Sequence, residues 1–161
     1  MFLAIIQFIF FIIFLVVGAL FMNTLAKTLK LVRFENRKIH PDQVWLLFVP
    51  IFNYYWLFRT VAGVSESIDT EYKRRGLPSP IATATWIGYV YAATFTLNFL
   101  LTVLNRYFSA NIPLLLTGLI GIASFGFWIA YWIVIAGLKQ QLKALPAEED
   151  SLIFSNIPVQ H

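Results

Sequence analysis

The chain contains no cysteine and only two histidines, His40 and His161, among its 161 residues. Without cysteine it can form no disulfide, no thiolate metal site and no catalytic thiol. Two histidines, one of them at the last position, also argue against a His-ligated haem in a membrane and against a His-rich metal site. We therefore expect neither a metal nor a cofactor.

Charged residues are also scarce: they make up 12% of the chain, whereas hydrophobic residues make up 59% and aromatic residues 17%. Soluble domains carry about 25% charged and about 45–50% apolar residues. A single soluble core of this size could not enclose so much apolar surface, but lipid can solvate it, so we predict an all-α integral membrane protein. The formal net charge is +4. Because the basic residues flank apolar segments, this charge indicates membrane anchoring, and we expect no nucleic-acid partner.

Three long uncharged runs predict three transmembrane helices, at about residues 2–22, 81–104 and 112–138. A spanning helix needs about 20 mostly apolar residues. The first run is longer than the apolar core of a signal peptide and has no basic residues before it, so we expect a retained span. The second span follows Ser79 and Pro80, which suit the cap and the first position of a helix.

A fourth apolar segment, residues 44–58, reads VWLLFVPIFNYYWLF and contains Pro50 and Asn53 near its middle. As a helix it would reach about 22 Å, which is short of the hydrocarbon core of about 30 Å. Pro50 interrupts a helix, and Asn53 can cap a new one that begins at the next residue. We predict a re-entrant or interfacial helix–break–helix. Four of its aromatic residues suit the headgroup layer: Trp45, Tyr54, Tyr55 and Trp56.

The distribution of Lys and Arg separates this path from a fourth, tilted span extending to about residue 64. Five basic residues lie in 27–43 and four in 59–80, but only Arg106 lies between the second and third spans. A tilted span would leave six basic residues on each side, whereas a segment that enters and returns leaves eleven of the twelve on one side. Short cytoplasmic loops carry the Lys and Arg excess. We therefore predict a bacterial inner-membrane protein with its N-terminus outside and its C-terminus in the cytoplasm.

Residues 59–76 are predicted to form an amphipathic helix at the cytoplasmic boundary. Val61, Val64, Ile68 and Tyr72 recur at helical spacing and share one face. Such a helix can lie on the membrane surface with its apolar face in the lipid. The alternative is a helix that links two spans and is solvated throughout.

The acidic residues of this helix are expected on its solvated face. Glu66, Asp69 and Glu71 are close enough to suggest a metal site, but a charged face in water is the simpler interpretation. Nearby basic residues are candidates for binding anionic lipid headgroups. They are Lys27, Lys30, Arg37, Lys38, Arg59, Arg74 and Arg75. We expect residues 1–145 to form one membrane domain, and residues 146–161 to be a tail that is loosely ordered or docked on a partner.

The second span carries small residues at every fourth position, a pattern that lets membrane helices pack closely. These residues are Ala84, Gly88, Ala92 and Thr96, with Gly126 and Ala130 at related positions of the third span. They could form a homodimer face, but the short connection NRYFSAN between the two spans favours antiparallel packing within the chain. Asn98 is the most polar residue inside a span, and we expect it to hydrogen-bond between helices or to bind a ligand.

Motifs for catalysis are missing: the sequence has no HExxH, no GxSxG and no glycine-rich phosphate loop. The three predicted spans also lack the ionisable residue that proton pumps and ion-coupled carriers usually need. We therefore expect a non-catalytic accessory or scaffold subunit of a larger inner-membrane complex, with lipids and other membrane subunits as partners. The alternatives are a homo-oligomeric channel or small transporter, and a lipid-binding membrane protein.

The region around the interrupted segment carries a resemblance. Trp45 is followed by Pro50-Ile51-Phe52-Asn53-Tyr54-Tyr55-Trp56, and then by Ser67-Ile68, Glu71 and Arg74-Arg75. This pattern resembles a broad group of small bacterial membrane proteins of unknown function, common in Bacteroidota-like genomes, which share a Pro-x-x-Asn-x-x-Trp break before a charged helix. The resemblance covers about 35 residues. It implies an inner-membrane protein and supplies no catalytic residues.

Overall fold

The computed structural model describes residues 2–145, and within this range all regular structure is helical. This confirms the predicted all-α class. The elements in chain order are α1 (Phe2–Leu31), η1 (Phe34–Asn36), η2 (Pro41–Phe48), α2 (Phe52–Arg74), α3 (Ala82–Phe108) and α4 (Leu114–Ala144), where η marks a 3-10 helix. The predicted tail, residues 146–161, lies outside the described residues.

Three helices are long and apolar enough to cross a membrane: Leu3–Leu31, Ala82–Phe108 and Leu114–Ala144. Each of them contains an uncharged stretch of about 25 residues, which spans about 37 Å at 1.5 Å per residue. This length exceeds the hydrocarbon core of about 30 Å and leaves room for tilt. The chain therefore has the three helices of the predicted multi-pass membrane protein.

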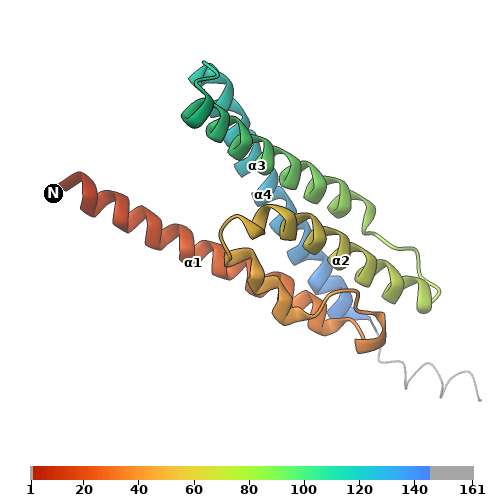
Figure 1. Ribbon diagram of the computed structural model, residues 1–161. Helices are drawn as coiled ribbons and strands as arrows, with labels where there is room; N and C mark the ends of the chain where they lie inside the picture. Colours follow the sequence, from red (N-terminus) through yellow and green to blue (C-terminus); the bar gives the residue numbers. More distant parts are fainter. Residues whose placement is uncertain (1, 146–161) are drawn as a thin grey trace, which may run out of the picture.

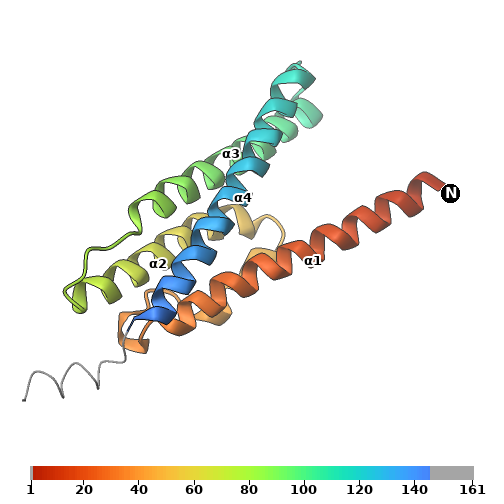
Figure 2. The same ribbon diagram turned by 180° about the vertical axis from the view of Figure 1, so that it is seen from behind.

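Helix α1 is longer than the predicted first span, because it continues beyond residue 22 to Leu31. Leu25 and Leu29 are buried in this extension, and the hydroxyls of Thr24 and Thr28 donate to backbone carbonyls one turn earlier. Apolar burial thus sustains the helix past its uncharged part, and both hydroxyls are satisfied within it. Both views of the fold show the other half of α1, toward the N-terminus, diverging from α3 and α4 (Figures 1 and 2).

Helices α3 and α4 pack along each other as an antiparallel pair, as the short connection predicts. Asn105 fastens the connection, because its side chain bonds the backbone N–H and carbonyl of Ile112 at 3.3 and 3.4 Å. The predicted cap at Ser79 is wrong. Helix α3 begins at Ala82, with Ile81 as the N-cap, since the first backbone hydrogen bond of the helix goes to the Ile81 carbonyl.

The segment before α2 runs antiparallel to it. The indole of Trp56 donates to the carbonyl of Gln43 at 2.7 Å, and the N–H of Lys38 donates to the hydroxyl of Ser67 at 2.8 Å. Residues 38–49 and α2 therefore form a hairpin of two antiparallel arms, because residues earlier in the first arm bond residues later in α2. A turn at Pro50 connects the two arms, so the predicted interruption is present at this residue.

The predicted cap at Asn53 is wrong. Helix α2 begins at Phe52, and Ile51, with φ of 66°, stands at the N-cap position. The N–H groups of Phe52 and Asn53 are already bonded to the carbonyls of Pro50 and Val49, so the first turn needs no side-chain cap. Asn53 consequently lies inside the helix.

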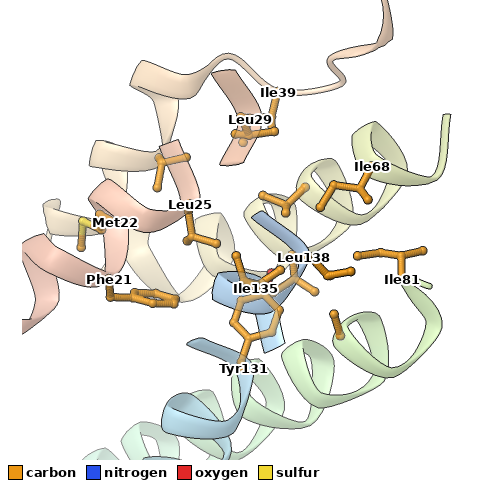
Figure 3. Close-up of a cluster of buried hydrophobic side chains, with 14 of the residues drawn as sticks. Phe21, Met22, Leu25, Leu29, Ile39, Ile68, Ile81, Tyr131, Ile135 and Leu138 are labelled. Carbon is orange, nitrogen blue, oxygen red and sulfur yellow. The ribbon is translucent and has the colours of Figure 1, made fainter. Parts of the chain in front are cut away.

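Helix α2 is one continuous element, of which the predicted amphipathic segment is the later part. Its predicted apolar residues, Val61, Val64, Ile68 and Tyr72, are all buried. They pack inside the protein, because α2 is in contact with α1, η1, η2 and α3. The core lies where α2 meets the later half of α1 and the later half of α4 (Figure 3).

Candidate functional site

A cavity of about 540 Å³ lies between the hairpin tip and the other helices. Its lining comes from α1 (within residues 14–22), α3 (within residues 91–99) and α4 (within residues 121–128). The end of η2 (residues 47–48), the turn at residues 50–51 and the first turns of α2 complete the wall. Its size falls in the range of about 300–1,000 Å³ that is typical of small-molecule sites. It begins where the core ends, since Phe21 borders both.

Aromatic rings form much of the wall. Nine of the twenty lining residues are aromatic, compared with 17% of the whole chain, and none is charged. Tyr54 of α2 stacks on Phe99 and Phe95 of α3, with ring centroids 4.1 and 5.2 Å apart. These stacked rings join the hairpin to α3, so the wall is built from segments that are distant in the sequence.

The cavity lies deep along the helices that can cross a membrane. On α3 its lining residues occupy the middle of the uncharged stretch, and on α4 the nearest charged residue, Lys139, is eleven residues beyond Trp128. Eleven helical residues rise about 16 Å. The cavity therefore lies along the uncharged parts of both helices.

Apart from the aromatic residues, three polar side chains line the cavity: Asn53, Asn98 and Ser124. Asn98 faces α4, because a Cβ placed on Gly121 would lie 3.3 Å from its Nδ2. The expected interhelical hydrogen bond is nevertheless missing. Within residues 2–145, the side chain of Asn98 forms no hydrogen bond, and its backbone carbonyl accepts one from the hydroxyl of Thr102. Asn53 has a buried Oδ1 without a partner among these residues.

The other residues of the interrupted segment position the hairpin. Trp45 is partly exposed and stacks on Phe48, and Pro50 lies in the cavity wall. Trp56 stacks on Phe52 and ties α2 to η2 through its bond to Gln43. Pro50 and Asn53 thus line the cavity, whereas Trp45 and Trp56 do not.

The small residues of α3 pack within the chain. Ala84, Gly88 and Ala92 are buried, and a Cβ on Gly88 would come within 2.8 Å of both Tyr131 and Val61. Thr96 is partly buried, and its hydroxyl has no partner among residues 2–145. The close approach therefore involves α2 as well as α4.

The residues predicted on α4 do not form the main contact with α3 within the chain. Gly126 is exposed with no atom within 4 Å of an added Cβ, and Ala130 is only partly buried. The buried residues of α4 are instead Ser124, Trp128, Tyr131, Ile135, Leu138 and Leu142. They recur at spacings of three and four and so share one face of α4, from which Tyr131 packs against Gly88 of α3.

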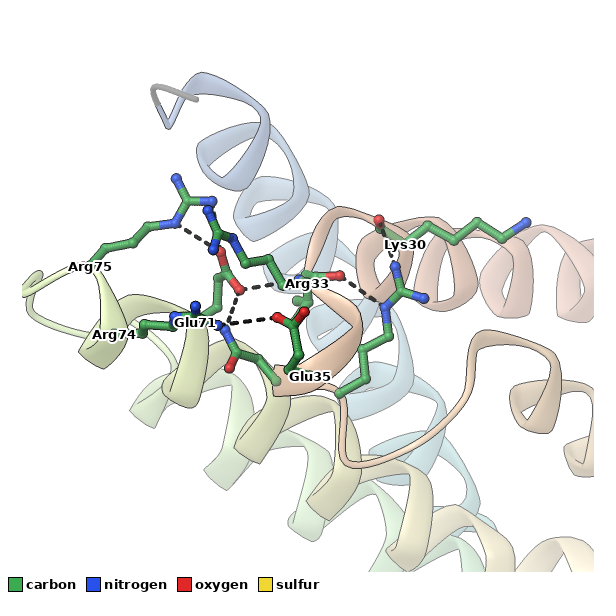
Figure 4. A network of polar contacts seen from close by, with 9 residues as sticks. Lys30, Arg33, Glu35, Glu71, Arg74 and Arg75 are labelled. Carbon is green, nitrogen blue, oxygen red and sulfur yellow. Dashed lines mark hydrogen bonds and ion pairs between the residues drawn. The ribbon is translucent and has the colours of Figure 1, made fainter. Parts of the chain in front are cut away.

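The predicted solvated face fails at Glu71, which is only 1% exposed. Its Oε2 accepts hydrogen bonds from the N–H of Arg33 at 3.1 Å and from Asn36 at 2.7 Å, and its Oε1 pairs with Arg75 at 2.6 Å (Figure 4). Burial alone would raise the pKa of Glu71, but the bonds from Asn36, Arg75 and the Arg33 N–H outweigh it and hold the pKa below 4.5. This carboxylate binds the turn after α1 to the end of α2.

The candidate headgroup-binding residues fall into two groups. Arg37 donates to the carbonyls of Val32 and Lys30, Arg74 pairs with Glu35 at 3.2 Å, and Arg75 pairs with Glu71. Four others are exposed: Lys27, Lys30, Lys38 and Arg59. The structure therefore assigns three of the seven to contacts within the protein.

Within the described part of the chain, no three His, Asp or Glu side chains gather closely enough to hold a metal ion. Comparison with family models, curated proteins and solved structures finds no match. The sequence analysis did not predict the cavity, because no periodic pattern of residues indicates it. It also missed the burial of Glu71, although the Glu71–Arg75 spacing of four residues was a signal for an ion pair.

Proposed function

We propose that this chain is a non-enzymatic membrane protein that binds a lipid molecule in the cavity between α1, the hairpin tip and the α3–α4 pair. The observation that carries the proposal is the cavity itself, which is mostly apolar, lacks charged residues and lies along the uncharged parts of α3 and α4. With these helices across the membrane, the cavity is at hydrocarbon depth. A water-soluble ligand would have to cross hydrocarbon to enter it, whereas lipid chains surround it at all times. Shape and dispersion contacts with the aromatic walls would supply the affinity.

The proposal includes the re-entrant path of residues 44–58, with the N-terminus outside and the C-terminus in the cytoplasm of a bacterial cell. Apolar side chains are exposed at the hairpin tip, among them Phe48, Val49, Ile51 and Phe52. The charged residues of the hairpin lie away from this end, so the apolar tip suits insertion into hydrocarbon. The excess of basic residues on one side sets the orientation.

Mass spectrometry of the purified protein under native conditions tests lipid binding. We expect a one-to-one lipid adduct that survives exchange into mild detergent. Gly121→Leu places a side chain in the cavity and should remove the adduct, whereas Gly118→Leu, on the same helix with open space around it, should leave the adduct intact. Equal adducts in both variants, or none in the wild type with lipid supplied, would refute the proposal.

An accessory subunit is the second candidate, and one observation favours it. The most apolar part of α1 has no buried residue, and Phe8, Phe10 and Phe11 are all more than half exposed. A transmembrane helix of a partner could pack against this half of α1 by van der Waals contact. Photo-crosslinking from position 10 in native membranes should capture a foreign subunit. Capture of only the same chain would instead favour the homo-oligomeric channel.

A further inference from the structure

Two of the polar side chains in the cavity wall come from the two helices of the α3–α4 pair, and neither forms a hydrogen bond within residues 2–145. Asn98 comes from α3 and Ser124 from α4, and both line the cavity. Gly121, one helical turn before Ser124, is the residue that the Asn98 amide approaches. Among residues 2–145, the structure gives neither side chain a hydrogen-bond partner, although Ser124 is buried and Asn98 is partly buried. Because both residues line the cavity, a molecule bound there would meet their polar groups.

Polar groups of this kind are costly at hydrocarbon depth. No water is available there, and an unbonded amide or hydroxyl is strongly penalised in an apolar medium. Asn98 offers two N–H donors and a carbonyl acceptor, and Ser124 offers a hydroxyl that both donates and accepts. A ligand carbonyl oxygen within reach of both can accept one N–H of Asn98 and the Ser124 hydroxyl.

We infer that the lipid in the cavity is a neutral one, whose carbonyl oxygen accepts hydrogen bonds from the Asn98 amide and the Ser124 hydroxyl. This inference rests on the proposed function. Phosphate-bearing headgroups are disfavoured, because no charged residue lines the cavity and an unpaired charge at this depth is strongly penalised. The long-chain part of the lipid packs against the aromatic wall that includes Phe95 and Trp128.

Two kinds of neutral membrane lipid carry such a carbonyl oxygen: an isoprenoid quinone, in its ring, and a diacylglycerol, in its esters. Binding is measured by native mass spectrometry with three probes, namely a long-chain quinone, a diacylglycerol and a hydrocarbon of similar length without oxygen. We expect Asn98→Leu and Ser124→Ala to weaken binding of a carbonyl probe about three- to thirtyfold, which corresponds to one membrane hydrogen bond. Binding of the hydrocarbon should not weaken.

Thr96→Val is the matched control, because Thr96 lies on α3 near Asn98 but does not line the cavity. It should change the binding of no probe. Size-exclusion profiles and helix content report whether each variant is folded, and Ser124→Ala removes a single oxygen should Asn98→Leu fail to fold. The stronger of the two carbonyl probes identifies the source of the lipid.

Two results overturn the inference, and they are distinguishable. If the wild type binds all three probes equally, and both variants do the same, a lipid site exists without recognition of a carbonyl. If the wild type binds no probe, the proposed function fails together with the inference.

Discussion

The side-chain amide of Asn36 donates a 2.7 Å hydrogen bond to Glu71 and thereby ties the turn after α1 to the end of α2. The same carboxylate accepts from the Arg33 N–H and pairs with Arg75. Glu71→Gln removes the charge and turns one acceptor into a donor that opposes the Asn36 amide. We expect a loss of about 3 kcal/mol in unfolding free energy. Thermal unfolding in detergent measures it, with the exposed Glu66→Gln as a control that should change little.

The same site predicts an acid-dependent stability. The pKa of Glu71 is lower in the folded protein than the ordinary 4.5, because the hydrogen bonds from Asn36, Arg75 and the Arg33 N–H outweigh the opposing effect of burial. A lowered folded-state pKa contributes stability above pH 4.5, and that stability is lost as the pH falls through the folded-state pKa. The difference in melting temperature between wild type and Glu71→Gln should therefore shrink in acid. A difference that is constant from neutral to acid pH would contradict this assignment.

Close packing at Gly88 predicts opposite outcomes for two glycines. Gly88→Ala brings a methyl group within 2.8 Å of Tyr131 and Val61, and it should destabilise the protein by about 1–3 kcal/mol. Gly126→Ala meets open space in a helix, so it should be neutral or stabilise by up to about 1 kcal/mol. Melting temperatures in detergent compare the two. Destabilisation by Gly126→Ala in native membranes alone would reveal a partner on that face of α4.

Helix α1 is linked to α4 by one side-chain bond, in which the Trp132 indole donates to the Thr24 hydroxyl at 3.0 Å. Thr24→Val keeps the volume but removes the acceptor. We expect a cost of about 1 kcal/mol and a change in the tryptophan emission, since Trp132 then has no acceptor at this position. Thr83→Val, an exposed threonine on α3, is the control. An unchanged spectrum and melting temperature would show that α1 is held by apolar packing alone.

Single cysteines can map the membrane path, because the chain has none of its own. With a re-entrant hairpin, labels at positions 38 and 66 should react only from the cytoplasmic side, and a label at position 109 only from outside. A label at position 51 should be shielded from water-soluble reagents on both sides. Labelling of position 66 from the outside would show that residues 44–58 cross the membrane.

The sequence alone predicts the membrane class, the three spans and the interruption at Pro50. These features depend on the length of uncharged runs and on a residue without a backbone donor, which are local properties of the chain. The antiparallel α3–α4 pair follows in the same way, since a short connection permits no other neighbour. Predicted helix ends were less accurate: backbone groups of the turn satisfied the first N–H groups of α2, so Asn53 was not used as a cap.

The tertiary structure decided which polar groups face water, protein or the cavity. Glu71 looks like a solvated residue in sequence, and it is buried because Arg33 and Asn36, from a distant turn, supply its hydrogen bonds. Asn98 looks like an interhelical clasp, yet the small residue opposite it, Gly121, leaves a space in place of a partner. Such outcomes depend on contacts with side chains from segments that are distant in the sequence, and no local sequence pattern predicts those contacts. Hydropathy therefore specified the spans, whereas the packing of distant segments created the site.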